Sequence, residues 1–124
     1  MPKRLQRKRT KGFKLTTDNP NGYVFVGRPS KWGNPYRIVE LKSVQKFVVT
    51  GDGKIITSHK TKEAAVAQCV NCFMDYLDYM QPSDLEELLE PLRGKDLACW
   101  CRLYDESGLR VPCHADYLLE LANK

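Results

Sequence analysis

Apolar residues in the second half of the chain recur with helical spacing. They predict a helix of about 18 residues that begins near Lys62 and ends before Pro82. After it, Ser83 is a helix N-cap with Glu86 at the capping-box position, which predicts a second helix that stops at Gly94. Residues 113–123 predict a final helix. The apolar stripe of the first helix comprises Ala65, Val66, Cys69, Val70, Phe73, Leu77 and Met80.

Shorter runs of β-branched and aromatic residues predict strands. Residues 23–26 follow a turn signal, and residues 96–101 read as a short buried strand that could lie beside them. Residues 45–50 and 54–58 flank a turn with two glycines, which predicts a β-hairpin, and residues 37–41 could add a strand before it. The fold class is therefore α/β: a small single-domain sandwich with mainly parallel central strands, a β-hairpin and about three helices.

Composition narrows the class of protein. The hydrophobic fraction of 42% is too high for a disordered chain, and no apolar run is long enough to span a membrane. The basic start is not followed by the apolar segment of a signal peptide, so we expect a cytoplasmic protein, in a bacterial or phage-infected cell on the resemblance given below.

The net charge of +5 is unevenly distributed. Residues 1–14 hold seven basic side chains and no acid, whereas residues 15–124 hold 13 basic and 15 acidic side chains. We therefore expect a basic N-terminal arm at residues 1–14 and a single α/β domain at residues 15–124. The arm suits phosphates, which predicts a nucleic-acid or nucleotide partner, although a disordered solubilising tail fits the composition equally well. Its candidate substrate-binding residues are Arg7, Arg9 and Lys11.

A loop rich in Gly and Pro follows the first predicted strand, at residues 27–36. Its donors would suit an anion or a base edge, and its indole offers a stacking surface. For the indole alone, packing as a lid on the core is at least as well supported. The candidate binding residues of this loop are Arg28, Ser30, Lys31, Trp32 and Asn34.

The chain has five cysteines, an odd number that disfavours a complete disulfide framework. Cys99 and Cys101 are two apart in a predicted strand and share a face, and Cys113 and His114 begin the last helix. A helix start lowers the pKa of a thiol, which favours Cys113 as thiolate. Three interpretations stay open for this group: a metal site, most simply zinc held by Cys99, Cys101, Cys113 and His114; a catalytic thiol without metal; and plain buried cysteines.

Cys69 and Cys72 form a second cysteine pair, inside the long predicted helix. Cys69 belongs to the apolar stripe and is expected in the core, and Cys72 lies towards the margin of the stripe. A redox pair or additional metal ligands are less favoured, because redox CxxC motifs usually begin a helix.

Three blocks of sequence resemble a small family of phage and bacterial proteins catalogued as a domain of unknown function. They have the patterns RxQRKRTKG near the N-terminus, GRPSKWGNP after the first strand, and DLxCWC followed by PCHAD. The resemblance implies an accessory enzyme of phage nucleic-acid metabolism that acts on modified guanines such as 7-deazaguanines.

Two functions remain. In the first, the chain is an enzyme acting on an anionic nucleotide or nucleobase, with Cys113, His114 and Asp116 as catalytic residues. Asp116 would orient His114 or shuttle a proton and, without zinc, Cys113 would be the nucleophile and His114 its base. In the second, the chain is a non-catalytic module that binds nucleic acid or protein and has a structural zinc. The sequence does not determine the oligomeric state.

Overall fold

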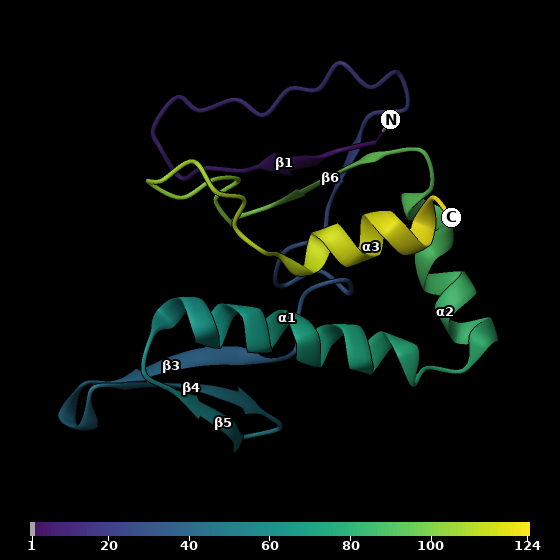
Figure 1. The fold of residues 1–124 in the computed structure, drawn as a ribbon. Helices are drawn as coiled ribbons and strands as arrows, with labels where there is room; N and C mark the ends of the chain where they lie inside the picture. Colours follow the sequence, from purple (N-terminus) through teal and green to yellow (C-terminus); the bar gives the residue numbers. More distant parts are fainter. Residues whose placement is uncertain (1) are drawn as a thin grey trace. The chain divides into compact units, whose positions relative to one another are not determined.

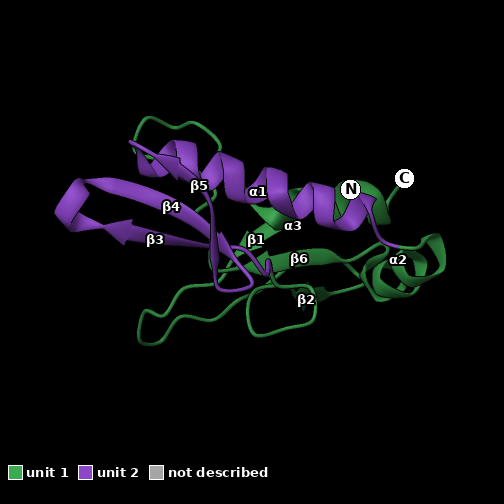
Figure 2. Cartoon of the chain, turned by 90° about the horizontal axis from the view of Figure 1, so that it is seen from below, with its two compact units in different colours: residues 1–33, 81–124 green, residues 34–80 purple. Residues whose placement is uncertain are grey.

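The computed structural model describes residues 2–124. The chain divides into two compact units: one contains the residues up to Gly33 together with Gln81–Lys124, and the other is the continuous stretch Asn34–Met80 (Figures 1 and 2). The second unit is thus an insertion between two parts of the first. Each is described by itself.

The first unit is built on a parallel sheet of three short strands, in the order β1-β6-β2. Strand β1 spans Arg4–Gln6, β2 spans Tyr23–Phe25 and β6 spans Asp96–Cys99. All four residues of β6 are buried, as expected for the central strand of a parallel sheet. The predicted pairing of residues 23–26 with residues 97–100 is confirmed, since Val24 lies opposite Leu97 and Phe25 opposite Ala98.

Two α-helices complete the first unit: α2 (Pro82–Leu89), which is extended by the 3₁₀ turn η2 (Glu90–Leu92), and α3 (His114–Ala122). Helix α3 packs on β6 and β1 and buries Ala115 and Leu118. The predicted start of α2 is wrong: Gln81, not Ser83, is the N-cap. Pro82 occupies the first helical position, where its missing N–H has no partner to lose, so the helix begins earlier.

The second unit packs one helix on an antiparallel sheet. Its strands are β3 (Arg37–Leu41), β4 (Lys46–Gly51) and β5 (Lys54–His59), with the 3₁₀ turn η1 (Lys42–Val44) between the first two. Helix α1 (Lys62–Asp78) begins at the N-cap Thr61, whose hydroxyl accepts a hydrogen bond from the Ala64 N–H over 3.2 Å. The β4–β5 hairpin turns at Asp52 and Gly53, both with positive φ, as two-residue hairpin loops require.

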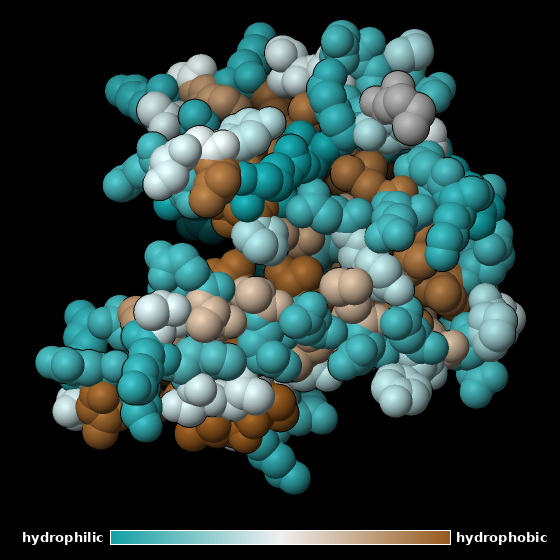
Figure 3. Space-filling model, in the orientation of Figure 1, coloured by the Kyte–Doolittle hydropathy of each residue, from teal (hydrophilic) through white to brown (hydrophobic). Residues whose placement is uncertain are grey.

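The α/β class is confirmed, with a parallel sheet, an antiparallel hairpin sheet and three α-helices. Within residues 2–124, none of the helices has the length and apolar character needed to cross a membrane. The face in Figure 3 is mostly hydrophilic, with separate apolar patches. Exposed apolar side chains of the antiparallel sheet and its turn include Val39, Val44, Ile55 and Ile56.

Candidate functional site

The candidate site lies at the carboxyl end of the parallel sheet. Because β1, β6 and β2 run in the same direction, the segments that follow them leave the sheet at one edge. The backbone continues the pairing there: the Arg7 N–H donates to the Cys99 carbonyl over 2.7 Å, and the Val26 N–H donates to the Ala98 carbonyl over 2.8 Å. Ligands of open parallel sheets bind at this edge.

Three cysteine thiols converge at this edge. The Sγ atoms of Cys99, Cys101 and Cys113 all lie within 4.8 Å of one another. Cys99 and Cys113 are each 1% exposed, with 3.2 Å between their sulfurs, whereas Cys101 is half-buried. Cys99 ends β6 and Cys113 is the N-cap of α3, so the fold unites two segments separated by a loop. The sequence prediction that these three cysteines could meet is confirmed.

The imidazole of His114 lies beside this thiol group, and contacts of both ring nitrogens fix its orientation. Its Nε2 is 2.8 Å from the Val26 carbonyl oxygen, and its Nδ1 is 3.4 Å from the Sγ of Cys113. A carbonyl only accepts hydrogen bonds, so Nε2 bears the proton, and in a neutral ring Nδ1 then has its lone pair. Burial lowers the pKa of His114, which favours that neutral ring.

The three thiols differ in acidity. Hydrogen bonds from Cys113 and Cys99 lower the pKa of Cys101 to about 2. Because its thiol donates to Cys101, the pKa of Cys99 rises to about 11, and hydrogen bonding to Cys101 and Cys99 raises that of Cys113 as well. Among the three thiols, hydrogen bonding to the neighbouring sulfurs therefore favours Cys101 as the acidic one, and the prediction that Cys113 is the nucleophile stays a prediction.

The residue set fits a zinc ion. Tetrahedral zinc with bonds of about 2.3 Å to sulfur separates two sulfur ligands by about 3.8 Å, and the three sulfurs lie within 4.8 Å of one another. The compact group that could hold an ion consists of the three cysteines alone, with His114 adjacent to it. The hydrogen bond from Nε2 to a backbone carbonyl is typical of a histidine that ligates a metal through its other nitrogen. Three of the four predicted zinc ligands are thus assembled in one group, and the fourth, His114, neighbours Cys113.

Asp116 forms ion pairs with two arginines. Its Oδ2 accepts from the Arg4 guanidinium over 2.7 Å, and its Oδ1 accepts from Arg110 over 3.1 Å. The Arg4 side chain is fully buried and also donates to the backbone carbonyls of Arg102 and Leu103. Asp116 thereby fixes the loop before α3 to strand β1. Its predicted role as partner of His114 stays a prediction.

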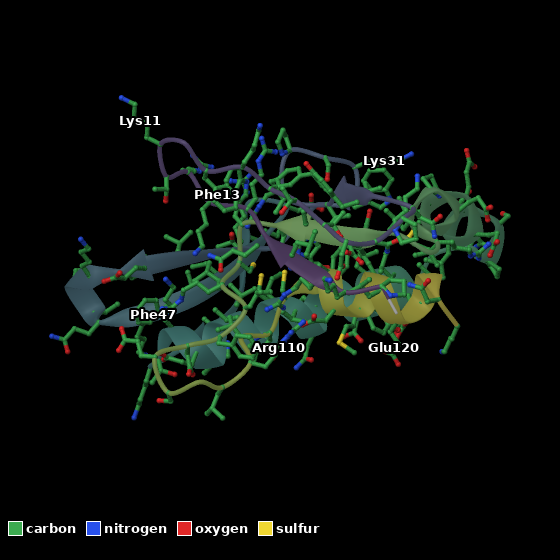
Figure 4. The ribbon with its side chains drawn as sticks, turned by 90° about the horizontal axis from the view of Figure 1, so that it is seen from above. Lys11, Phe13, Lys31, Phe47, Arg110 and Glu120 are labelled. Carbon is green, nitrogen blue, oxygen red and sulfur yellow. The ribbon has the colours of Figure 1, made fainter. Side chains whose placement is uncertain are left out.

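Two residues of the predicted basic arm lie against an aromatic side chain. The guanidinium carbons of Arg9 and Arg7 are 4.4 and 5.2 Å from the centre of the Trp100 ring, and Arg7 is also 5.1 Å from the Phe25 ring. Part of the arm is ordered structure, since Arg4–Gln6 form β1. Lys11 extends outward from its loop (Figure 4).

Three of the five predicted binding residues in the loop after β2 make contacts within the fold. The Trp32 indole donates to the Leu88 carbonyl over 2.8 Å, which anchors it on α2, and Lys31 lies 4.8 Å from the Trp32 ring. Asn34 is 7% exposed and bonds to the backbone of Cys69 and Tyr36 within the second unit. These contacts are structural, whatever else the loop binds.

Arg28 and Ser30, from the same loop, belong to the first unit and its candidate site. After burial, the positive charge of Arg28 is one of the smaller contributions that lower the pKa of His114. The Ser30 hydroxyl is buried and has no hydrogen-bond partner among residues 2–124.

Sequence reasoning missed Arg4, Phe25 and Trp100 as parts of this region. Trp100 was available as a signal because it separates the two cysteines of the CWC motif. Arg4 gave no signal of its own as one of seven basic residues in the arm, since its burial depends on pairing with a residue far along the chain. The prediction that Cys69 lies in the core is confirmed, since it belongs to the buried cluster of the second unit. Cys72 belongs to the same cluster.

Comparisons with known proteins give a family and no function. No curated protein and no solved structure matches the chain. The family model described as "Domain of unknown function (DUF4326)" matches residues 5–124, which include the thiol group, the loop after β2 and most of the basic segment. The chain belongs to this family.

Proposed function

We propose that the chain is a zinc-dependent enzyme that acts on a nucleotide or a nucleobase. The observation that supports this most strongly is the convergence of three cysteine sulfurs within 4.8 Å at the carboxyl edge of the parallel sheet. Four-coordinate sites with soft ligands are typical of zinc, and this edge is where parallel sheets bind their ligands.

Cys99, Cys101 and Cys113 would hold the ion. Zinc supplies a Lewis acid that polarises a carbonyl group or lowers the pKa of a water molecule. The thiolate character of Cys101 favours metal binding at neutral pH, because the ligand is already deprotonated. His114 would complete the coordination or stay beside an open position that admits substrate.

The preference for an anionic substrate comes from the charges around the thiol group. The charge of Arg28 contributes to lowering the pKa of His114, and Arg7 and Arg9 follow β1 at the same edge. A modified guanine such as a 7-deazaguanine is the first base to test, because the sequence resemblance suggests it. An accessory role in phage nucleic-acid metabolism belongs to the same proposal.

The alternative is a binding module with a structural zinc and no turnover. It is favoured by the burial of Cys99 and Cys113, each 1% exposed, because structural zinc sites are closed to solvent. In that case His114 would be the fourth ligand.

Metal analysis and a turnover assay together test the proposal. Purified protein is analysed for zinc and incubated with guanine nucleotides, 7-deazaguanine bases and nucleic acid, with products detected by mass spectrometry. We expect one zinc per chain and a product that is absent with Cys101→Ser and present with the matched variant Cys69→Ser. If Cys101→Ser does not fold, His114→Gln takes its place.

Each result decides between the functions. Zinc binding without turnover on any substrate of this panel would overturn the enzyme and support the module. Protein that neither purifies with zinc nor takes it up would overturn both functions.

A further inference from the structure

A second cluster lies beside the thiol group, on the residues that follow β1. It is a cavity of about 470 Å³, within the range of about 300 to 1,000 Å³ that is typical of ligand sites. All the charged residues of its lining are basic, and three are aromatic. The lining residues are Arg7, Lys8, Arg9, Thr10, Phe13, Lys14, Leu15, Tyr23 and Trp100. Phe13 is one of the labelled side chains in Figure 4.

The Trp100 ring of this cavity is held by a contact with Phe25, which is not itself a lining residue. The Trp100 ring meets the Phe25 ring edge to face, with 5.6 Å between centres and 73° between planes. Gly27 lets Phe25 adopt this position, because a Cβ at residue 27 would lie 2.7 Å from the Phe25 ring. The backbone hydrogen bond from Arg7 to Cys99 fixes the basic side of the cavity to the sheet. The site is therefore largely preformed.

The cations of this cavity have no neutralising carboxylate. Among residues 2–124, the ion pairs involve Lys3, Arg4, Arg93 and Arg110, and none involves Arg7, Lys8, Arg9 or Lys14. Two of the four cations rest on the Trp100 face, where the ring quadrupole partly balances their charge. Such a surface attracts an anion, and phosphates are the anions that clustered Arg and Lys side chains bind.

We propose that this cavity binds single-stranded nucleic acid, with one unpaired base among its three aromatic side chains and the adjoining phosphates on Arg7, Arg9 and Lys14. An aromatic ring inside a cavity stacks with a base only if that base has left its duplex, so the site selects single strands. The proposal rests on the proposed function for its biological sense, since the cavity and the thiol group both adjoin the carboxyl end of β6.

Fluorescence anisotropy with a labelled DNA oligonucleotide, single-stranded or annealed to its complement, tests the proposal. The full chain should bind the single strand about tenfold more tightly than the duplex. Arg9→Ala and Trp100→Leu should each weaken single-strand binding about tenfold, and added salt should weaken it further. The matched control is Lys46→Ala, which removes an exposed cation of β4 and should leave binding unchanged.

Three results would overturn the site: equal affinity for duplex and single strand, equal losses with Arg9→Ala and Lys46→Ala, or no binding at low salt. Circular dichroism checks that each variant folds, and Arg9→Ala alone decides the matter if Trp100→Leu does not fold. Binding without turnover would remove the enzyme and keep this site. Turnover of free nucleotides without binding of single-stranded DNA would overturn this site and keep the enzyme.

Discussion

Two buried polar clusters lie at opposite ends of strand β6. At its amino end, the Asp96 carboxylate is 1% exposed and accepts hydrogen bonds from the Lys3 N–H, the Asn19 side chain and the Thr17 hydroxyl. At its carboxyl end, the Cys99 and Cys113 thiols hydrogen-bond chiefly to other sulfurs and to one imidazole nitrogen. The Asp96 cluster is thus satisfied by the chain, whereas the thiol group is a set of potential ligands. This difference separates a structural cluster from the candidate functional one.

The largest effect should come from removing a sulfur at the carboxyl end. Cys113→Ser should weaken zinc binding at least about 100-fold, because it removes a proposed ligand. Cys69→Ser is the control: it changes another buried thiol, in the core of the second unit, and should lower stability without changing zinc affinity. Competition with a chromophoric chelator measures both affinities. Equal losses would mean that the effect is one of folding.

A smaller loss is expected at the imidazole. His114→Gln should weaken zinc binding about 10- to 100-fold, because the ring is fixed to the Val26 carbonyl and its Nδ1 lone pair faces Cys113. The same competition experiment measures it. Wild-type affinity in this variant would remove His114 from the proposed site and leave the three cysteines.

At the amino end the effect should fall on stability instead. Asp96→Asn replaces an acceptor with a donor opposite existing donors and should lower the free energy of unfolding by about 1–3 kcal/mol. Urea unfolding, with zinc content measured in parallel, checks this. A loss of zinc in a folded Asp96→Asn protein would contradict the separation of the two clusters.

Acid should lower the free energy of unfolding through the Asp96 cluster, as Asp96→Asn does. Burial raises the pKa of Asp96, but the hydrogen bonds from Asn19, Thr17 and Lys3 outweigh it and leave the pKa below its usual value. A carboxyl group with a depressed pKa stabilises the fold above its unfolded pKa, about 3.9, and this stability is lost as the pH falls through the folded pKa.

Unfolding measured from pH 6 to pH 2 should therefore show a steeper acid loss in wild type than in Asp96→Asn. Asp18→Asn is the control at an exposed carboxylate. Lys3 also lowers the pKa of Asp18, but solvent screens the ion pair between Lys3 and Asp18. Parallel acid profiles for wild type and Asp96→Asn would refute the role given to Asp96.

The contrast between the ends of β6 also shows which structural features could be predicted from the sequence. Local patterns predicted the elements that depend on them: the apolar stripe of α1, the hairpin turn at Asp52 and Gly53, and the pairing of β2 with β6. The CWC motif and the Cys113-His114 pair were sufficient to bring the thiols together. Helix α2 began earlier than expected because Pro82 tolerates the first position.

Other features depend on contacts between distant segments. The burial of Arg4 requires β1 to pair with β6 and Asp116 to reach it from α3. The acidity of Cys101 depends on hydrogen bonds from two other thiols, which no helix-start argument contains. Likewise, the stacking of Arg9 on Trp100 joins residues from both ends of the chain.

X-ray absorption at the zinc edge, on protein purified without added chelator, tests the proposed metal site most directly. We predict a first shell with three sulfur ligands at about 2.3 Å and one nitrogen or oxygen ligand, matching the sulfur group of Cys99, Cys101 and Cys113. A shell of oxygen and nitrogen alone, or protein that neither contains nor takes up zinc, would contradict it.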